Sequence, residues 1–563
     1  MGSQKILLML LPFWDSLIPP LGIGCLKSYL EKHGYPVKTV DANVDAELKQ
    51  FYRHYFDALQ AAVPVQNRGN FYSTGHDVLR QQMMAFQHYE DEAAYRELVR
   101  LMISETFYCT LREEQVVQLD RVIGSFYRGL EEYMYRLLSR EKPTVLGLSV
   151  FSGTFPASLF TFKLAKKYDP RLTTVMGGGI FCDQLAAGSP DFRFFLEKTE
   201  PYIDRLVIGE GEALFLKLLQ DGPTGTRRVY TAADLGGAPL DLAGLESPDF
   251  SDFDIQHYPS LSTFGSRGCP YRCSFCSAAV FWGKFRRKPV RRIVAELTAL
   301  YGRHRSQLFL FCDSLLNLFI DELARALTDP GLPVYWEGYL RAGEEACNDD
   351  APLRWRRGGA YRFKMGLESG SARVLGLMGK KITPEQIGES LIHIAAAGIK
   401  TSTLWVVGHP GEREADFVRT LGLIEAFKDD IYEAECTPFT YHPAGQVGAE
   451  DWQRSGKSQL LYPAWAQPML ISQTRVLDCE PPRREIYSRV NRFVQHCRRL
   501  GIPNPYSLAD IYQADRRWQK LHKNAVPPLL AFKGAGTVID ERKDVKALRW
   551  AANTLSPGGD FVF

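Results

Sequence analysis

Three closely spaced cysteines are the strongest chemical signal in the sequence. Cys269, Cys273 and Cys276 stand in the segment GSRGCPYRCSFCSAAVFWG with the spacing C-x3-C-x2-C. Thiolates this close together are typical ligands of iron–sulfur clusters. Gly268 and Pro270 suit a turn beside them, because glycine accepts unusual backbone angles and proline restricts them. With only three protein ligands, one iron of a 4Fe-4S cluster stays open to another molecule.

Two other interpretations of these cysteines are weaker. A structural zinc site is closed by four protein ligands, usually as two pairs, and no second pair follows. The chain has 11 cysteines in 563 residues, and we expect no secretory leader, so the pattern does not favour a disulfide framework. The next cysteines along the chain are single and far apart: Cys312, Cys347 and Cys436.

The cysteine segment, with the aromatic Phe275 directly before the last cysteine, resembles the signature of radical SAM enzymes. The resemblance implies that S-adenosylmethionine (SAM) chelates the open iron through its amino and carboxylate groups. It also implies that the cluster donates one electron, which breaks a C–S bond of SAM and forms a 5′-deoxyadenosyl radical. The task left to the protein is to position these groups and to exclude competing chemistry.

Helix and strand patterns alternate after the cysteines, as a radical SAM barrel requires. RRIVAELTALYGRH has the apolar spacing of a helix, SQLFLFCDSLL is typical of a buried strand, and further units follow. Barrels carry their polar site residues at the C-terminal strand ends. By resemblance, the SAM site includes Phe275 and a set of residues at these ends: Asp313, Ser314, Arg341, Glu368, Ser369, Gly408 and Pro410.

The resemblance also implies a role for each strand end. The end at Asp313 is expected near the SAM amino group, the GLESGS segment near the ribose and carboxylate, and the VVGHPGE turn near the adenine. Simpler alternatives exist for two of these residues. Asp313 could cap a helix, and Glu368 could form an ordinary ion pair with Arg341 or Lys364.

A second alternating pattern precedes the cysteines. KILLMLLPF, PVKTVDANVD, TVLGLSVFSGT, LTTVMGGGI and DRLVIGEGE read as strands, and helical segments such as PPLGIGCLKSYLEKHG separate them. Alternating strands and helices with glycines at the strand ends predict a doubly wound parallel sheet, which binds ligands at its C-terminal edge. MGGG is not the G-x-G-x-x-G of dinucleotide-binding proteins, so a plain dinucleotide site is not favoured.

The segments PPLGIG, VMGGG and IGEGE ahead of a radical SAM motif look like the cobalamin-binding domain of B12-dependent radical SAM enzymes. A corrin is broad and flat, so small residues must let the sheet edge approach it. The chain lacks D-x-H-x-x-G, so no histidine is expected as the lower cobalt ligand. The alternative is a related sheet that binds nothing. By resemblance, the cobalamin site includes Pro20, Gly22, Ser149, Ser152, Gly177, Gly178, Gly179, Gly209, Glu210 and Gly211.

The expected fold is α/β and has four parts. Residues 1–235 form a doubly wound, Rossmann-like cobalamin-binding domain, with a helical insertion at about 45–142 that is either a packed subdomain or a lid over cobalamin. Residues 236–260 are a linker, and residues 261–447 form a partial (β/α)6 radical SAM barrel. Residues 448–563 form a mixed C-terminal extension that closes the barrel mouth and contacts the substrate.

Composition and charge exclude several classes of partner. Hydrophobic residues make up 45% of the chain and charged residues 24%, as in ordinary globular proteins. A net charge of +3 gives no strong attraction to nucleic acid or membranes, and ILLMLLPFW is too short to span a bilayer. We therefore expect a cytoplasmic protein with neither kind of partner.

The resemblance implies a cobalamin-dependent radical SAM methyltransferase, of class B, acting on a carbon of a small-molecule, carrier-bound or peptide substrate. One SAM would methylate cobalamin, and a second would make the radical that activates the carbon. Flavodoxin or ferredoxin is the expected electron donor. With the same cofactors, the alternatives are cyclisation, epimerisation, rearrangement, or methylation without hydrogen abstraction. An alternative of another class is a non-catalytic iron–sulfur binding or sensing protein.

Overall fold

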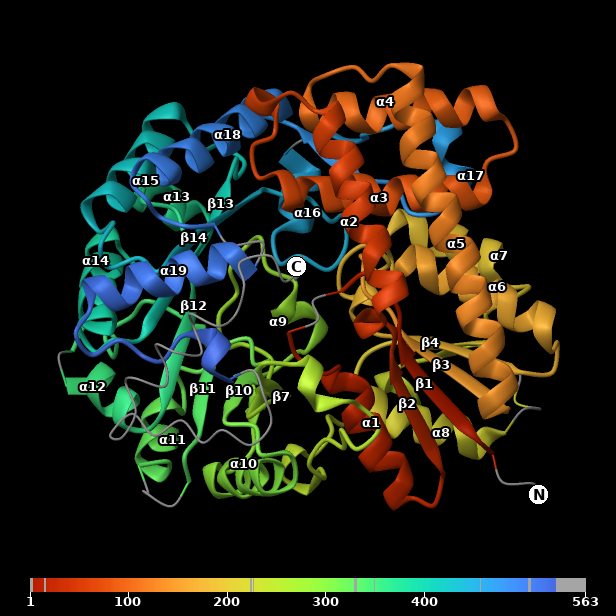
Figure 1. Cartoon of the computed structure of the whole chain (residues 1–563), viewed down its shortest axis with the longest axis horizontal. Coiled ribbons are helices and arrows are strands. Elements are labelled where there is room, and N and C mark those ends of the chain that lie inside the picture. The colour runs from red at the N-terminus through yellow and green to blue at the C-terminus, as the bar shows by residue number, and fades with distance from the viewer. Residues whose placement is uncertain are drawn as a thin grey trace.

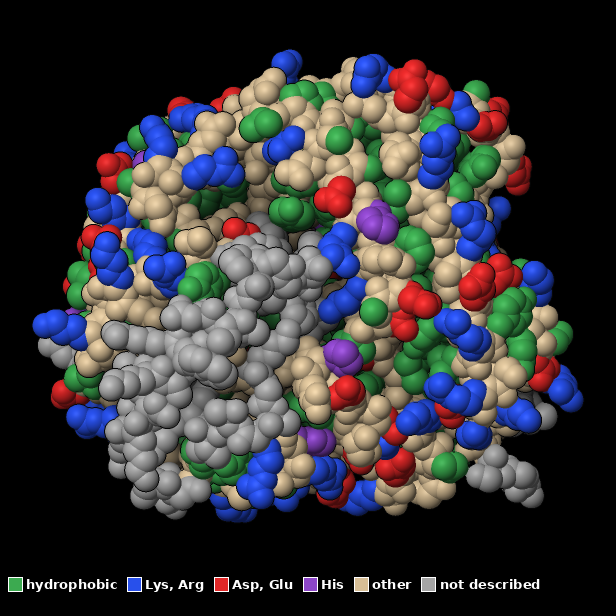
Figure 2. Space-filling model, in the orientation of Figure 1, with side chains coloured by type: hydrophobic (Ala, Val, Ile, Leu, Met, Phe, Trp, Pro, Cys, Tyr) green, Lys and Arg blue, Asp and Glu red, His purple; other side chains and the backbone are tan. Residues whose placement is uncertain are grey.

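The computed structural model contains two parallel sheets whose carboxyl edges face each other, with a helical region joined to both (Figure 1). It describes residues 4–14, 17–222, 225, 227–328, 332–348, 350–455, 457–504 and 508–532. The predicted C-terminal part therefore lies partly outside the described residues. The face drawn in Figure 2 carries side chains of both charge signs intermixed, in keeping with the small net charge.

The N-terminal sheet is parallel, with the strand order β2-β1-β3-β4-β5-β6. The five buried residues of the first strand, ILLML, alternate between two cores, because Leu7 and Met9 face one side of the sheet and Leu8 faces the other. A sheet buried on both faces is the doubly wound arrangement. Its elements are β1 (Ile6–Leu10), α1 (Leu21–Lys32), β2 (Val37–Asp41), β3 (Val145–Ser149), α6 (Phe155–Tyr168), β4 (Thr173–Gly177), α7 (Pro190–Thr199), β5 (Arg205–Val207), α8 (Gly211–Asp221) and β6 (Val229–Tyr230).

Four helices are inserted between the second and third strands of this sheet. Their apolar faces share one core with the sheet face that α6 covers, so the insertion is packed and is not a separate body. Asp45 and Asp91 accept hydrogen bonds from backbone N–H groups at the starts of α2 and α4, as N-caps do. The four are α2 (Ala46–Ala62), α3 (Phe71–His88), α4 (Glu92–Phe107) and α5 (Glu113–Glu141).

The second sheet is also parallel, and its order β14-β13-β12-β11-β10-β7 follows the chain, as in a partial (β/α)6 barrel. Its strands are β7 (Leu261–Thr263), β10 (Leu308–Phe311), β11 (Tyr335–Leu340), β12 (Ala360–Glu368), β13 (Lys400–Val407) and β14 (Glu433–Pro438). Its helices are α10 (Val290–His304), α11 (Ile320–Ala326), α12 (Asp350–Arg357), α13 (Ala372–Leu377), α14 (Pro384–Ala396) and α15 (Glu414–Ala426).

A short antiparallel hairpin lies at the C-terminal end of β7. It consists of β8 (Ser266–Arg267) and β9 (Arg286–Arg287), and the cysteines and α9 (Ala278–Phe281) lie between its strands. The hairpin therefore presents the cysteine segment at the barrel mouth. This is the end at which β/α barrels carry their sites.

The C-terminal segments pack on both halves of the molecule. Helix α18 packs against β14 and α15 of the barrel, whereas α17 packs against α3 of the insertion. Asp515 on α19 lies 2.5 Å from the Lys400 amine, an ion pair that ties this helix to strand β13. The elements are α16 (Ala449–Ser455), β15 (Lys457–Leu460), α17 (Gln467–Leu470), β16 (Arg475–Asp478), α18 (Arg483–Arg499) and α19 (Leu508–Leu521). Within the described residues, no helix is both long and apolar enough to cross a membrane.

Candidate active site

The cysteine loop is held in place by its backbone. The Ser274 N–H donates to the Met378 carbonyl at 2.9 Å, and the Gly448 N–H donates to the Ser274 carbonyl at 2.8 Å. The Gln446 amide donates to the Phe275 carbonyl at 3.0 Å. Gly268 begins the loop with a φ of +84°, and a Cβ there would lie 2.8 Å from the Lys284 carbonyl oxygen. Only glycine fits this turn, as the sequence predicted.

All three cysteines carry free thiols, and Cys273 is the most buried of them. Burial raises the pKa of Cys269 and Cys276, and the neighbouring thiols raise it further. In the described part of the chain, no three His, Cys, Asp or Glu side chains converge on the site of a single ion.

Positive charge surrounds these thiols. The Arg341 guanidinium stacks on the Tyr271 ring at 4.0 Å, and the Lys380 amine lies 5.8 Å from the Phe275 ring centre. Arg341 and Lys380 both oppose the rise in the pKa of Cys269, because a cation favours the thiolate. The residues present thus fit a cluster with thiolate ligands.

One buried polar atom beside the loop has no partner. Arg341 is 6% exposed, and its Nη2 makes no hydrogen bond to the described residues. A buried donor left unpaired costs about 1–3 kcal/mol, so such an atom marks a place where an acceptor is expected. A ligand carboxylate would satisfy it, which fits the predicted SAM site.

Glu368 joins the same group from strand β12. Its carboxylate pairs with Lys380 at 2.7 Å, not with Arg341 or Lys364, and its backbone has a φ of +65°. Such a backbone is uncommon for a residue other than glycine and is often found at functional sites. Sequence reasoning missed Lys380, although the GKK run that contains it follows α13 directly.

Asp313 stands at the end of β10, where the sequence predicted it, but its oxygens are already occupied. They accept from the Gly265 N–H at 2.9 Å and from the Ser266 hydroxyl. Asp313 thus anchors the strand that leads into the cysteine loop, and it does not cap a helix. Burial raises the pKa of this carboxyl to about 6. Ser314 follows it and is half-buried.

The remaining predicted SAM residues lie at strand ends and hold neighbouring helices. Ser369 lies 3.3 Å from the Thr420 hydroxyl on α15. The Gly408 N–H donates to Glu412 at 2.8 Å, and a Cβ at Gly408 would lie 2.4 Å from Ile486 on α18. Pro410 follows in the same turn and accepts from the His409 ring at 3.0 Å. Their contact with SAM stays a prediction.

The glycines that end β4 are required by packing within the sheet. Gly178 has a φ of +110°, and a Cβ there would lie 2.5 Å from backbone atoms of Val150. A Cβ at Gly179 would lie 2.8 Å from the Phe151 ring. Gly177 belongs to the same strand end, and its carbonyl accepts from the Val150 N–H at 2.7 Å. The close contacts at Gly178 and Gly179 explain these two glycines without any ligand.

Other predicted cobalamin positions face open space. A Cβ at Gly22 or at Gly209 would meet nothing within 4 Å, whereas one at Gly211 would touch Leu26. Open space beside two glycines at the C-terminal edge leaves room for a broad, flat group, so this edge fits a corrin. Pro20 caps α1, Ser149 ends β3 and Ser152 is exposed. Contact of these residues with cobalamin stays a prediction.

The carboxyl edge of the N-terminal sheet lies against the barrel mouth. The Ser277 hydroxyl, one residue after the last cysteine, donates to Asp183 at 2.8 Å. The Ser262 hydroxyl of β7 donates to the Pro19 carbonyl at 2.7 Å. Glu210 accepts from Arg267 at 2.8 Å, so its carboxylate points to the cysteine hairpin. The two predicted cofactor regions therefore share one interface.

A histidine that the sequence patterns did not reveal lies at the same edge. The Nε2 atom of His76, on α3, would lie 2.7 Å from a Cβ at Gly153 in the loop after β3. Burial lowers the pKa of His76 to about 4, so the ring is neutral at pH 7. No motif could have identified it, because it comes from the insertion.

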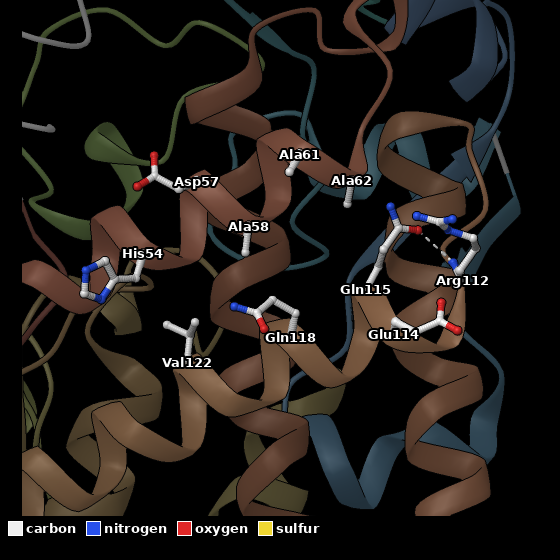
Figure 3. A pocket seen from close by; sticks show the side chains of 10 residues that line it. All are labelled: His54, Asp57, Ala58, Ala61, Ala62, Arg112, Glu114, Gln115, Gln118 and Val122. Atoms are coloured by element: carbon white, nitrogen blue, oxygen red, sulfur yellow. Dashed lines mark hydrogen bonds between the residues drawn. The ribbon is translucent and has the colours of Figure 1, made fainter.

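A surface hollow in the insertion lies away from these residues. It has a volume of about 560 Å³ and lies between α2 and α5 of the insertion (Figure 3). His54, Asp57 and Gln118 are among the residues that line it. None of the predicted site residues lines this hollow, so the candidate site rests on the chemistry of the interface and not on the size of a pocket.

Residues 264–424 match the sequence profile of the Radical SAM superfamily. An uncharacterized methyltransferase of Pyrococcus horikoshii is 26% identical over 58% of this chain and 72% of its own length. An anaerobic magnesium-protoporphyrin IX monomethyl ester cyclase of Rubrivivax gelatinosus is 24% identical over 55% of this chain, which spans 59% of the cyclase. Cytidylyl-2-hydroxyethylphosphonate methyltransferase of Streptomyces wedmorensis is 24% identical over 69% of each chain.

Two solved structures resemble most of the chain. The radical S-adenosylmethionine methyltransferase TsrM of Kitasatospora setae, with tryptophan and a SAM analogue bound, superposes with a TM-score of 0.57 at 15% identity over 90% of each chain. The cobalamin-dependent radical enzyme OxsB, with aqua-cobalamin and SAM bound, gives a TM-score of 0.50 at 15% identity over 92% of this chain and 66% of its own.

Residues 264–424 are therefore a radical SAM domain. The two-part fold of the chain resembles those of TsrM and OxsB, so the predicted α/β fold and the resemblance to radical SAM enzymes are confirmed.

Proposed function

We propose that this protein is a cobalamin-dependent radical SAM methyltransferase that methylates a carbon of its substrate. The observation that carries the proposal is the shared interface, in which the cysteine loop and the glycine-rich sheet edge meet through the 2.8 Å bond between Ser277 and Asp183. Chemistry that needs both cofactors requires that their sites be adjacent. A substrate would then lie between the two domains.

Each group of residues described above would have its own role in binding the cofactors. The three cysteine thiolates hold a 4Fe-4S cluster, and the unpaired Nη2 of Arg341 offers a donor to the SAM carboxylate. The open edge beside Gly22 and Gly209 receives cobalamin. When bound, the cluster supplies an electron, SAM a methyl group and a radical, and cobalamin a methyl carrier. The contacts of Ser274 and Phe275 keep the cysteine loop rigid, which limits reorganisation during the reaction.

The relatives support methyl transfer, because two of them carry that activity in their names. Assignment to class B is the finer part of the proposal and rests on family resemblance alone. The substrate class stays open among small molecules, carrier-bound intermediates and peptides; tryptophan in the TsrM structure is an example of a small molecule. Flavodoxin or ferredoxin is proposed as the electron donor, and the cytoplasm as the location.

Cyclisation is the second candidate function. It is favoured by one observation, namely that magnesium-protoporphyrin IX monomethyl ester cyclases from three organisms are 24–25% identical to the chain over about half of its length. The two functions share cofactors but differ in the fate of the SAM methyl group. SAM labelled in that methyl group therefore distinguishes them, because only methyl transfer incorporates the label into product.

The proposal is tested on protein purified and reconstituted without oxygen, then supplied with SAM and dithionite. We expect 5′-deoxyadenosine and S-adenosylhomocysteine as products, and stoichiometric cobalamin retained on the protein. Cys109→Ala, which removes a thiol from the insertion, is the matched control and should keep both activities. Failure to form either product would support the non-catalytic alternative, and failure to bind cobalamin would reject methyl transfer through cobalt.

A further inference from the structure

Two glutamates and two arginines form a largely buried charge cluster where the N-terminal sheet meets the cysteine hairpin. We name these four residues the Glu–Arg bridge: Glu210, Glu212, Arg267 and Arg286. Glu210 caps α8 and Glu212 lies in its first turn. Arg267 and Arg286 are paired across the hairpin β8–β9, on either side of the cysteine loop. The bridge thus joins the turn after β5 to both ends of that loop.

The contacts in the Glu–Arg bridge are short and mostly bidentate. Arg267 Nη1 lies 2.8 Å from Glu210 and 3.2 Å from Glu212, while its Nη2 binds the second oxygen of Glu212. The two terminal nitrogens of Arg286 lie 3.0 and 3.1 Å from Glu210. The side chain of Arg267 is 11% exposed and that of Glu212 is 4% exposed. Bidentate pairs of this kind fix orientation as well as distance.

The charges of the Glu–Arg bridge are complementary, because each arginine contacts at least one glutamate. Arg267 contacts the carboxylates of both Glu210 and Glu212, and these contacts offset the cost of burying its charge. Burial also opposes the charge of Glu210, but hydrogen bonds from Arg286 and Arg267 lower its pKa. Stacking near Phe264 at 4.8 Å and Trp282 at 5.3 Å further restricts the Arg267 side chain. A fully paired, restricted guanidinium is suited to holding two elements in one geometry.

The position of the bridge in the chain gives it a consequence beyond stability. Arg267 is two residues before Cys269, and Glu210 stands between Gly209 and Gly211. Between Glu212 and Arg267 the chain runs through α8, the two-residue strand β6 and a segment of short turns. A connection of that kind does not fix the distance between the β5–α8 turn and the cysteine loop. The Glu–Arg bridge joins the same two segments by direct contacts.

We propose that Arg267 is a positioning residue that sets the distance and orientation of the cysteine loop relative to the β5–α8 turn of the sheet. This inference rests on the proposed function, in which that turn belongs to the cobalamin site. Methyl and radical chemistry on one substrate tolerates little displacement between its reacting groups. Loosening the bridge should therefore move the two cofactors relative to each other while each still binds.

The test compares Arg267→Lys and Glu212→Gln with a matched control, Arg362→Lys. Arg362 and Glu337 form a bidentate pair of almost equal burial inside the barrel, with side chains 12% and 3% exposed and a shortest contact of 2.7 Å. The first readout is backbone hydrogen exchange in residues 205–213, 264–268 and 284–288. We expect exchange there to rise by about tenfold or more in both bridge variants, and not in the control.

The second readout is the magnetic interaction between the reduced cluster and cob(II)alamin, measured by electron paramagnetic resonance. Both bridge variants should keep wild-type iron and cobalamin content, while the interaction between the two centres changes. An unchanged interaction in folded, fully loaded Arg267→Lys would overturn the inference, as would an equal change in Arg362→Lys.

Two further outcomes are decisive. If both bridge variants lose the cluster, the bridge serves stability only and the positioning role is rejected. If the wild type binds no cobalamin, the proposed function fails, and hydrogen exchange still decides whether the bridge holds the cysteine loop to the β5–α8 turn.

Discussion

The barrel mouth and the edge of the N-terminal sheet meet at one interface, but they present different chemistry. The barrel mouth offers side chains: three free thiols, the unpaired Nη2 of Arg341, and Glu368 paired with Lys380. The sheet edge offers backbone and open space, as at Gly22 and Gly209. A group bound through covalent ligands needs particular atoms, whereas a broad, flat cofactor needs room. Function is therefore easier to assign from residue identity at the mouth than at the edge.

The largest effect is expected at the barrel mouth. Replacing Cys269, Cys273 or Cys276 with Ala should abolish the iron–sulfur absorbance and all SAM cleavage, because a site with three ligands has no spare thiolate. Iron content and 5′-deoxyadenosine formation are the measurements. The sheet edge should be unaffected, so cobalamin should still bind. A single mutant with full iron and activity would show that these thiols are not the cluster ligands.

At the sheet edge, two glycine substitutions separate packing from binding. Gly178→Val should lower cobalamin occupancy, but it should also destabilise the domain by roughly 3 kcal/mol, because the side chain clashes with Val150 at a positive φ. A Cβ at Gly22 would meet nothing within 4 Å, so Gly22→Val should preserve the thermal unfolding temperature and lower cobalamin occupancy alone. Both variants should keep the cluster. Normal cobalamin binding by Gly22→Val would mean that the corrin does not lie over α1.

Replacing Arg341, whose Nη2 atom has no hydrogen-bond partner among the described residues, tests whether the barrel mouth binds SAM. Arg341→Met should weaken SAM binding by roughly tenfold to a hundredfold, the effect of losing a charge-assisted hydrogen bond, with unchanged iron content. Glu368→Ala should also weaken SAM binding. Equilibrium binding of SAM to the loaded protein is the measurement, and Arg272→Met, at an exposed arginine of the same loop, is the control. Equal SAM affinity in the wild type and Arg341→Met would reject the predicted contact.

Asp313 should give a smaller, pH-dependent effect. Burial raises its pKa to about 6, so the folded protein holds this proton more tightly than the unfolded chain does. The stabilisation that comes from the protonated Asp313 carboxyl is full below about pH 4 and is lost as the pH rises through 6. Relative to Asp313→Asn, the wild type should therefore lose up to about 3 kcal/mol between pH 4 and 7. Denaturant unfolding of both proteins at several pH values checks this, and a constant difference would contradict it.

The last prediction is an absence of effect at the sheet edge. Because D-x-H-x-x-G is missing, cob(II)alamin bound to the protein should show no nitrogen coupling from a histidine in its electron paramagnetic resonance spectrum. His76 lies at this edge, so His76→Ala should leave the spectrum unchanged. A nitrogen coupling that disappears in His76→Ala would identify this residue as a cobalt ligand.

Local sequence patterns predicted most of the architecture. The alternation of apolar strands and amphipathic helices indicated two parallel α/β units, and both sheets are parallel. It also indicated the helices of residues 46–141. Whether the insertion is packed or a lid was left open, since that depends on which surface its apolar faces bury. The structure buries them in the core of the sheet.

The sequence by itself identified the proposed ligands of the cluster, because covalent ligation needs only the right atoms at short chain separation, and Cys269, Cys273 and Cys276 lie within eight residues. Partners distant in the chain were decided only by tertiary structure. Lys380 pairs with Glu368 in place of the two cations considered from sequence, and Glu210 faces Arg267, 57 residues away. A chain of this length offers many lysines and arginines as possible partners for each carboxylate. Only the folded structure decides which of them lies beside it in a buried position.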